Sequence, residues 1–446
     1  MSPTFQAMPI RSALHTLALT AVALLLCVIY GKTHFYRDPG SAFYDPNRAF
    51  ERRYSLHREG EAQNYIDDRV GGSGARDATT KAGVEPRVCA AFSTVKRESV
   101  QYIETAVGSV LHGLTEPERA DLFLTVFFAN INASVHPTWE QPWLRPLADD
   151  AYTYDDVPGS ELSHLRTLEE TRNFAEKGVF DYTYALQHCY DVGTPYVAMF
   201  ENDTHFAHGW FVRALLALRE IEAITTTTTS DNDENNGNVK SWLYMRLFNQ
   251  ERSTGWANRN VFGNNEHWII LAFASVILLP ALFIRRRSPR RHTAATAAAA
   301  SFHQFYHRHL GVLVVLALVT IPSFTILFFQ SGKASLLPPA PGVFREAFGC
   351  CSQAMVFPRE SVPGVIEFLR ERREGQVDLL LDRYARESGL DTYALYPVQV
   401  QHVGSQSVRG TAVKEAQAVW SMAFENLKPA TLRKEHLDMV SRFYGQ

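Results

Sequence analysis

Three long apolar stretches constrain this chain more than any other feature of its sequence. They cover residues 13–30, 268–284 and 310–329. A helix needs about 20 apolar residues, with a range of about 17–25, to cross the roughly 30 Å hydrocarbon layer of a membrane. We therefore predict three membrane-spanning helices. The alternatives are a cleaved signal peptide for the first stretch, although no A-x-A cleavage site follows it, and a pair of buried core helices for the other two.

The segment between the second and third stretches indicates the orientation in the membrane. Residues 285–309 contain six arginines and no acidic residue, and short loops rich in Lys and Arg stay on the cytoplasmic side. The N-terminus is then cytoplasmic, and residues 31–267 and 330–446 lie in the lumen. Lys32 and Arg37 oppose this orientation, but the arginine-rich loop outweighs them. The first two stretches are short, which suits the thinner membranes of the early secretory pathway.

The overall composition is that of a globular protein. Hydrophobic residues make up 46% and charged residues 20% of the 446 residues, which excludes a mostly disordered chain, a collagen-like repeat and a small disulfide scaffold. The formal net charge of −3 provides no basic excess for binding nucleic acid.

The cysteines allow several arrangements. Cys27 lies in the first apolar stretch, which leaves Cys89, Cys189, Cys350 and Cys351 with three possible pairings into two disulfides. The sequence contains no CxxC pair, so we do not expect a zinc site. Adjacent cysteines do not easily bond each other. One expectation is therefore that Cys350 or Cys351 pairs with Cys189 or Cys89 in an oxidising lumen, and the other is a buried free thiol.

Strand-like and helix-like segments alternate after residue 88. Apolar runs typical of strands occupy residues 88–95, 121–130, 194–200, 241–249 and 393–404. Helical patterns occupy residues 97–114, 165–178, 182–192, 362–373 and 377–387. This alternation predicts an α/β fold with a mostly parallel sheet.

The apolar stretches divide the chain into segments. Residues 330–446 have too few strands for a separate sheet, so we predict that they complete the domain begun before the membrane hairpin. The predicted order is a cytoplasmic tail, an anchor, a lumenal stem with a Gly/Ser linker, the first part of the domain, the hairpin with its basic loop, and the second part. The bounds are 1–12, 13–30, 31–87, 88–267, 268–284, 285–309, 310–329 and 330–446. A domain tethered in this way suits a substrate that is itself fixed in the membrane.

The acidic motif Glu201-Asn202-Asp203 directly follows the apolar strand at residues 194–200. Ligands of open α/β sheets bind at the carboxyl ends of strands. Two carboxylates there can hold a hard divalent cation, which can neutralise a diphosphate. The alternative is an ordinary solvated strand end.

Several stretches resemble a known family. They are the residues from Cys89 to Leu111, LTEPERADLFLTVFFANI, YVAMFENDTHFAHGWF, SWLYMRLFN, CCSQAMVFPRE and YALYPVQVQHVGSQS. They are similar to the Golgi post-GPI-attachment N-acetylgalactosaminyltransferase family over most of residues 85–410. The family has an N-terminal span and a GT-A-type glycosyltransferase domain interrupted by a transmembrane hairpin. A more distant resemblance is to the branching N-acetylglucosaminyltransferases of N-glycans, which lack the hairpin.

The resemblance implies roles for particular residues. Glu201 and Asp203 fall at the family's acidic metal site, where Asn202 replaces a carboxylate. His402 is expected near the metal or diphosphate, and the alternative is a histidine bonded to backbone in a turn. Lys96 or Arg97 is expected to meet the phosphate of the nucleotide, and the alternative is a solvated helix start.

An inverting reaction also requires a general base, for which a carboxylate is the usual choice. Asp378 and Asp382 are four residues apart and share a helix face, and Glu360 is a third candidate. We select Asp378, against the alternative that each is a solvated helix carboxylate.

The resulting hypothesis is a Golgi glycosyltransferase that uses Mn²⁺ or Mg²⁺. It would transfer a sugar, GalNAc from UDP-GalNAc by resemblance, to a mannose of the glycosylphosphatidylinositol (GPI) glycan. One alternative is a related membrane transferase with another UDP-sugar or an N-glycan acceptor. Another is a non-catalytic membrane scaffold, an alternative that the departure at Asn202 keeps open.

Overall fold

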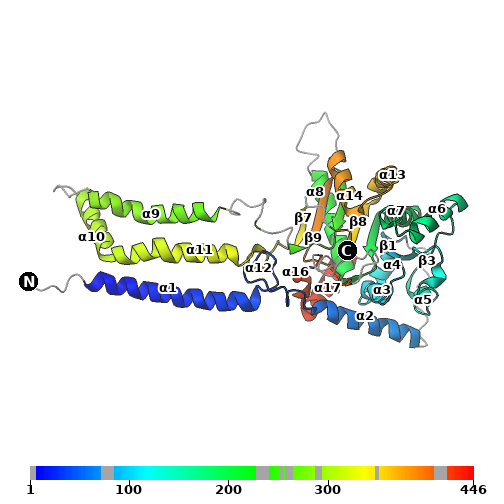
Figure 1. Cartoon of the computed structure of the whole chain (residues 1–446), viewed down its shortest axis with the longest axis horizontal. Helices are drawn as coiled ribbons and strands as arrows, with labels where there is room; N and C mark the ends of the chain where they lie inside the picture. The colour runs from blue at the N-terminus through cyan, green and yellow to red at the C-terminus, as the bar shows by residue number, and fades with distance from the viewer. Residues whose placement is uncertain are drawn as a thin grey trace, which may run out of the picture. The chain divides into compact units, whose positions relative to one another are not determined.

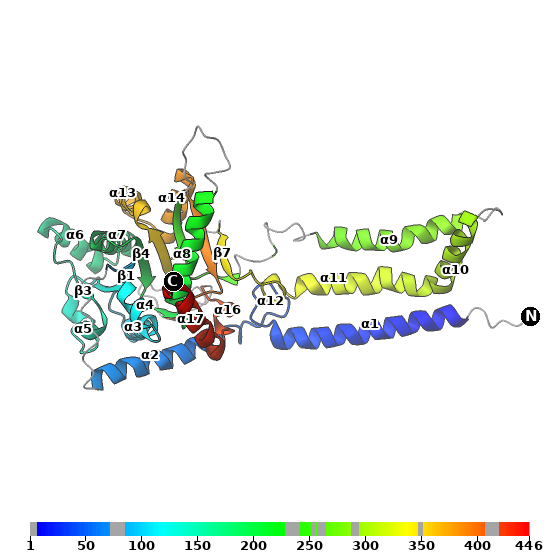
Figure 2. The same ribbon diagram turned by 180° about the vertical axis from the view of Figure 1, so that it is seen from behind.

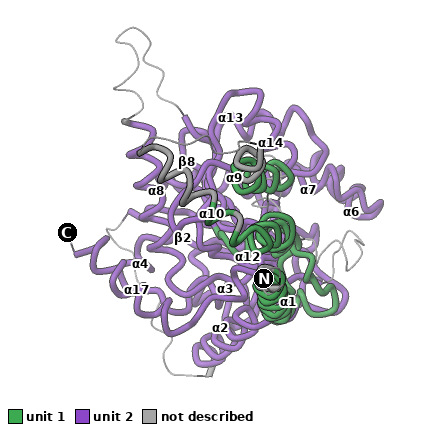
Figure 3. Tube along the Cα trace, turned by 90° about the vertical axis from the view of Figure 1, so that its left-hand side faces the viewer, with its two compact units in different colours: residues 1–50, 254–338 green, residues 51–253, 339–446 purple. Residues whose placement is uncertain are grey.

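The computed structural model describes residues 7–71, 85–227, 241–251, 256, 265–286, 294–346, 351–405 and 419–445. Most of the predicted Gly/Ser linker, part of the basic loop and Cys350 lie outside these ranges. The chain divides into two compact units (Figure 3), one formed by residues 1–50 and 254–338 and the other by residues 51–253 and 339–446.

The first unit is helical (Figure 1). It contains α1 (Ala7–His34), α9 (Glu266–Arg286), α10 (Ala294–Val315), a π-helical turn (Leu316–Thr320), α11 (Ile321–Gln330) and α12 (Lys333–Leu336). Two segments are long and apolar enough to cross a membrane, Ile10–His34 and Arg308–Gln330, and they contain the first and third predicted stretches. Within the described residues, α9 provides a shorter apolar helix, Glu266–Pro280.

Polar contacts join the two long apolar segments. The hydroxyls of Thr20 in α1 and Thr320 in the π-helical turn are 2.9 Å apart. Beyond the apolar segments, the Asp38 carboxylate accepts hydrogen bonds from the backbone N–H (2.8 Å) and hydroxyl (2.9 Å) of Ser335. Hydrogen bonds between apolar helices favour one pairing over others, because the helices alone have no hydrophobic preference for each other in lipid.

The second unit is built on an eight-stranded sheet with the order β3-β2-β1-β4-β8-β6-β9-β7. These strands are β1 (Val88–Thr94), β2 (Leu122–Phe128), β3 (Asp150–Tyr152), β4 (Tyr196–Glu201), β6 (Trp242–Arg246), β7 (Gly342–Arg345), β8 (Ala354–Pro358) and β9 (Asp391–Tyr396). Strands from both sides of residues 254–338 belong to this one sheet. A separate two-stranded ribbon pairs β5 (Thr204–Phe206) with β10 (Val400–His402).

The sheet is mixed. Four neighbouring pairs are parallel, and the three pairs that involve β8 or β7 are antiparallel. The predicted mostly parallel arrangement therefore holds for six strands, while β7 and β8 run the opposite way. Alternation with helices indicates parallel pairing only where a helix joins two strands of the sheet. The chain enters β7 from the apolar helices instead, so the alternation does not predict the direction of this strand.

Helices cover both faces of the sheet. One face packs on α3 (Ile103–Leu111) and α8 (Trp210–Thr227), and the other packs on α7 (Phe174–Val192), α13 (Val362–Arg372) and α14 (Val377–Ser388). Side chains alternate between the two faces along a strand. In β4, Ala198 and Phe200 therefore face the first layer, whereas Val197 and Met199 face the second. This alternation also sends Glu201 toward the layer that contains α7.

The shorter elements complete the domain. They are α4 (Glu116–Asp121), α5 (Leu144–Leu147), α6 (Gly159–Glu170), α16 (Met422–Glu425), and the 3-10 turns Ala133–Val135 and Arg359–Ser361. The predicted helix at residues 165–178 is wrong as one element, because the chain breaks between α6 and α7. There Asn173 caps α7 by accepting a hydrogen bond from the N–H of Glu176 (3.4 Å).

Two further helices, α2 (Tyr54–Gly71) and α17 (Pro429–Tyr444), support the domain from its edge. Helix α2 lies in the predicted stem, and its fully buried Arg58 donates to the Phe206 carbonyl (2.7 Å) and the Ser109 carbonyl (2.8 Å). Helix α17 packs beside α8 (Figure 2). It is anchored by His436, whose Nε2 is 2.8 Å from the Glu118 carboxylate.

A disulfide joins β1 to α7. It links Cys89 and Cys189, whose Cα atoms are 5.5 Å apart. The expectation that either one pairs with Cys350 or Cys351 is therefore wrong, because β1 and α7 are packed directly against each other. Cys351 is also disulfide-bonded, so it is not a free thiol.

Candidate functional site

The candidate site lies over the carboxyl ends of the central strands. Strand β1 pairs with β2 on one side and with β4 on the other, so the order of connection reverses at β1. In open α/β sheets such a reversal marks where ligands bind. A cavity of about 840 Å³ opens at this position. All six residues predicted from the sequence line it: Lys96, Arg97, Glu201, Asp203, Asp378 and His402.

Three of these residues form a cluster of potential metal ligands. Ligand atoms of Glu201, Asp203 and His402 all lie within 4.8 Å of one another. The β5–β10 ribbon brings them together, because it places His402 opposite Thr204, the residue after Asp203. Nε2 of His402 is 3.4 Å from Oδ2 of Asp203. His402 therefore faces the acidic pair, although about two hundred residues separate them in the chain.

The segment before β8 holds the Glu201 carboxylate. Oε1 accepts a hydrogen bond from the Ser352 hydroxyl (2.6 Å), and Oε2 accepts one from the side-chain amide of Gln353 (3.3 Å). The backbone N–H of Glu201 also donates to the Gln353 carbonyl (2.9 Å). Sequence reasoning missed both residues. Their only signal was a position immediately before an apolar run within CCSQAMVFPRE.

Asn202 has a different role from that of a metal ligand. Its side-chain carbonyl accepts from Arg97 (2.7 Å), and its amide donates to the Thr94 hydroxyl at the end of β1 (2.7 Å). An Asn can both accept and donate here, whereas an ionised Asp only accepts. Asn202, which replaces the family's carboxylate, thus connects the ends of β1 and β4. The cluster of potential metal ligands is formed by the acids on either side of it, together with His402.

Arg97 and Lys96 are placed differently. The Arg97 guanidinium donates to Asp203 Oδ2 (2.9 Å) as well as to Asn202. Lys96 is exposed at the edge of the cavity, and its backbone N–H donates to the Asn130 side chain (2.8 Å). Arg97 is therefore built into the acidic cluster, while Lys96 is the more accessible of the two cations.

Asp378 lines the cavity at the start of α14. Its Oδ2 accepts from the Cys351 backbone N–H (3.1 Å), and its Oδ1 accepts from the Leu379 N–H (2.9 Å). Glu360 and Asp382, the other two carboxylates considered from the sequence, are not among the residues that line the cavity. The structure thus favours Asp378 among the three.

Burial and mutual charge separate the pKa values of the cluster. For Asp203, burial alone would raise the pKa, but nearby His402 and Arg97 lower it below its usual range. For Glu201, burial and then the charge of Asp203 raise the pKa. Burial would lower the pKa of His402, but Asp203 and Glu201 raise it. The cluster therefore contains an ionised Asp203 in a site that favours positive charge.

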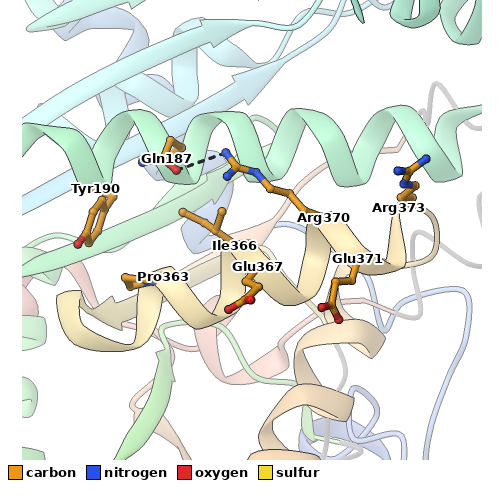
Figure 4. Close-up of a pocket in the computed structure, with 8 residues that line it drawn as sticks. All are labelled: Gln187, Tyr190, Pro363, Ile366, Glu367, Arg370, Glu371 and Arg373. Atoms are coloured by element: carbon orange, nitrogen blue, oxygen red, sulfur yellow. Dashed lines mark hydrogen bonds between the residues drawn. The ribbon is translucent and has the colours of Figure 1, made fainter.

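A second hollow lies between α7 and α13 (Figure 4). Its volume is about 640 Å³, and it shares no lining residue with the first cavity. Arg370 donates to Gln187 across it (3.4 Å), and Glu367 and Glu371 lie alongside. These are exposed charges of both signs on one helix face. The arrangement is typical of a solvated groove between two packed helices.

A mixed α/β sheet with a carboxylate–histidine cluster over its switch point, in a chain with helices long enough to cross a membrane, defines a membrane protein of the α/β class with a candidate ligand site at the strand ends. The particular family follows from a sequence comparison. The family model of the GPI-N-acetylgalactosamine transferase PGAP4 matches residues 88–401. The chain belongs to this family and is a glycosyltransferase. A comparison with curated proteins gave no match.

Proposed function

We propose that this chain transfers GalNAc from UDP-GalNAc to a mannose of the GPI glycan in a metal-dependent reaction. The membership of the family supports the sugar and the acceptor. The observation that carries metal dependence is the cluster of Glu201, Asp203 and His402 at the strand ends. A GT-A-type fold is part of the proposal, and the parallel order β3-β2-β1-β4 beside this cluster supports it.

Glu201, Asp203 and His402 would hold the metal. Two carboxylates and an imidazole are a donor set that suits Mn²⁺, and Mg²⁺ to a lesser degree because of the nitrogen ligand. When bound, the metal would neutralise the departing diphosphate. Ser352 and Gln353 orient Glu201 through hydrogen bonds, as partners of metal ligands commonly do.

Other cavity residues would act on the donor and the acceptor. Lys96 is free to approach a phosphate from the cavity edge, where a charge-assisted hydrogen bond would hold the nucleotide. Asp378 would accept the proton of the attacking mannose hydroxyl. The backbone N–H groups of Cys351 and Leu379 hold its carboxylate in place.

The proposed location is the Golgi membrane, with a cytoplasmic N-terminus, several spans and a lumenal catalytic domain. The Cys89–Cys189 disulfide supports an oxidising compartment for the domain. The six arginines of residues 285–309 support a cytoplasmic loop. A domain held at the membrane in this way would meet a lipid-linked glycan at the bilayer surface.

The test is UDP release by the full chain in detergent with Mn²⁺, a panel of UDP-sugars and a GPI-glycan acceptor. We expect acceptor-dependent release with UDP-GalNAc, and a loss of at least about 100-fold in the Asp203→Asn variant. Asp121→Asn is the matched control, because Asp121 and Asp203 are equally buried (7% exposed) and only Asp203 lines the cavity. Release with a different UDP-sugar would correct the donor, and Mn²⁺-independent release would reject the metal.

A further inference from the structure

Two buried polar atoms at the cavity have no hydrogen-bond partner among the described residues. They are the hydroxyl oxygen of Tyr182 in α7 and the side-chain carbonyl oxygen Oε1 of Gln353 before β8. Both residues line the cavity, and Gln353 is only 6% exposed. Buried polar groups in native proteins are nearly always paired, so two unpaired atoms on residues that line one cavity need an explanation.

The orientation of the Gln353 amide follows from its neighbour. Its NH₂ group donates to Oε2 of Glu201 (3.3 Å). A carboxylate that holds a metal, as proposed for Glu201, is ionised and only accepts hydrogen bonds, so the opposite orientation would place two acceptors against each other. Oε1 is therefore directed away from Glu201, and it requires an N–H or O–H donor that the described protein does not supply.

The Tyr182 hydroxyl complements this acceptor. Tyr182 lies on α7, the helix that packs under the face of the sheet toward which Glu201 points. Among the titratable side chains near the Tyr182 hydroxyl, Glu201 has the largest effect on its pKa, followed by Arg246 and Tyr244. Because burial raises the pKa of Tyr182 well above its usual value, the hydroxyl keeps its proton and can donate to an oxygen.

We infer that Tyr182 and Gln353 bind the sugar that is transferred. This inference rests on the proposed function: if Glu201 holds a metal against the diphosphate, the sugar attached to that diphosphate is the next part of the ligand. Gln353 would accept a hydrogen bond from the sugar, and Tyr182 would donate one. An acetamido group offers an N–H and a C=O, whereas ring hydroxyls offer O–H groups that can do both.

Such a pair would contribute selectivity as well as affinity. A site built to hydrogen-bond a substrate group rejects an analogue that lacks it, because the buried protein groups are then left unpaired. If the partner is the acetamido group, galactose in place of GalNAc would leave Gln353 and Tyr182 in the unpaired state seen here. If the partners are ring hydroxyls, the two sugars would bind these residues equally.

The experiment compares Tyr182→Phe with Tyr152→Phe in the full chain with Mn²⁺. Both hydroxyls are buried and both residues pack in the core on the same face of the sheet, but Tyr152 lies in β3 and does not line the cavity. Calorimetry gives the affinities for UDP, UDP-GalNAc and UDP-galactose, and UDP release gives kcat/KM. We expect Tyr182→Phe to weaken UDP-GalNAc binding by about 3- to 10-fold, the effect of one lost neutral hydrogen bond, with UDP binding unchanged. Tyr152→Phe should match the wild type.

Gln353→Met is the second variant, and its UDP affinity reports any disturbance of Glu201. Loss with UDP-GalNAc alone would assign the acetamido group, and equal loss with both sugars would assign ring hydroxyls. Equal loss with UDP itself in Tyr182→Phe, or no loss in either variant, would overturn the inference. If the wild-type chain binds UDP-GalNAc but transfers no sugar, the proposed function is rejected. The contribution of Tyr182 and Gln353 to sugar binding can still be measured in that case. A wild-type chain that binds no sugar nucleotide would overturn both.

Discussion

Gly404 offers a direct way to displace one carboxylate of the cluster without removing it. A Cβ added at this position would lie 2.8 Å from Cγ of Asp203 and closer still to its Oδ2. Gly404 is not in a left-handed backbone conformation, so alanine itself introduces no backbone strain. The Gly404→Ala substitution therefore acts on the position of the Asp203 carboxylate, which is the free end of a side chain and can move.

The size of the effect follows from this distance. Carbon atoms in contact prefer about 3.5–4.0 Å, so the carboxylate must shift by roughly 1 Å. Its bonds with Arg97 (2.9 Å) and His402 (3.4 Å) would then be stretched or lost. A misplacement of about 1 Å in a catalytic constellation can cost about 100-fold in rate. Stability should change by only about 1 kcal/mol, because alanine also restricts the unfolded chain.

The assay pairs turnover with folding. Gly404→Ala should lower Mn²⁺-dependent UDP release by about 100-fold and weaken Mn²⁺ binding, with a urea midpoint that shifts by no more than the equivalent of about 1 kcal/mol. Gly159→Ala is the matched control, because no atom lies within 4 Å of the Cβ added there. The reasoning that the Asp203 carboxylate lies against Gly404 would be refuted if Gly404→Ala kept wild-type Mn²⁺ affinity and turnover while Asp203→Asn was inactive. A large fall in stability would show that the glycine serves packing.

Three further outcomes follow from the same structure. The Cys89→Ala/Cys189→Ala double variant should lose about 4–5 kcal/mol of unfolding free energy in urea, because the bond spans 100 residues of sequence; an unchanged midpoint would contradict this. Asp378→Asn should lower kcat by about 10²- to 10⁴-fold at unchanged UDP affinity, and an unaltered kcat would remove Asp378 as the base. Burial lowers the pKa of His136 to about 4 from 6.5. The neutral ring therefore stabilises the fold fully above pH 6.5, and about 3 kcal/mol is lost as the pH falls toward 4; His136→Gln should flatten this dependence in urea titrations.

Much of the fold was predictable from local patterns. Strand β1 at residues 88–94 and strand β4 at residues 196–201 match the predicted runs closely, because a buried strand requires consecutive apolar residues. The break before α7 and the reversed strand β8 were not predictable in this way. The first depends on a capping bond at Asn173, and the second depends on which neighbours a strand meets after the chain returns from the apolar helices.

The candidate site shows the same division. Glu201 and Asp203 stand out in the sequence because they follow a strand directly, and His402 stands out only through resemblance. Tyr182 lies within a helix and has no sequence signal, and Gln353 has only its position immediately before an apolar run. Only the packed domain shows that both line the cavity beside Glu201.

The sequence by itself determined the apolar segments and the acidic end of the strand that becomes β4. Hydropathy and periodicity are properties of short, continuous stretches of sequence, so they can be recognised without the tertiary structure. Tertiary structure alone decided that His402 meets Asp203, that Cys89 bonds Cys189, and that Asn202 joins two strand ends. These contacts join residues far apart in the chain, and their geometry exists only after the sheet and its two helical layers have packed.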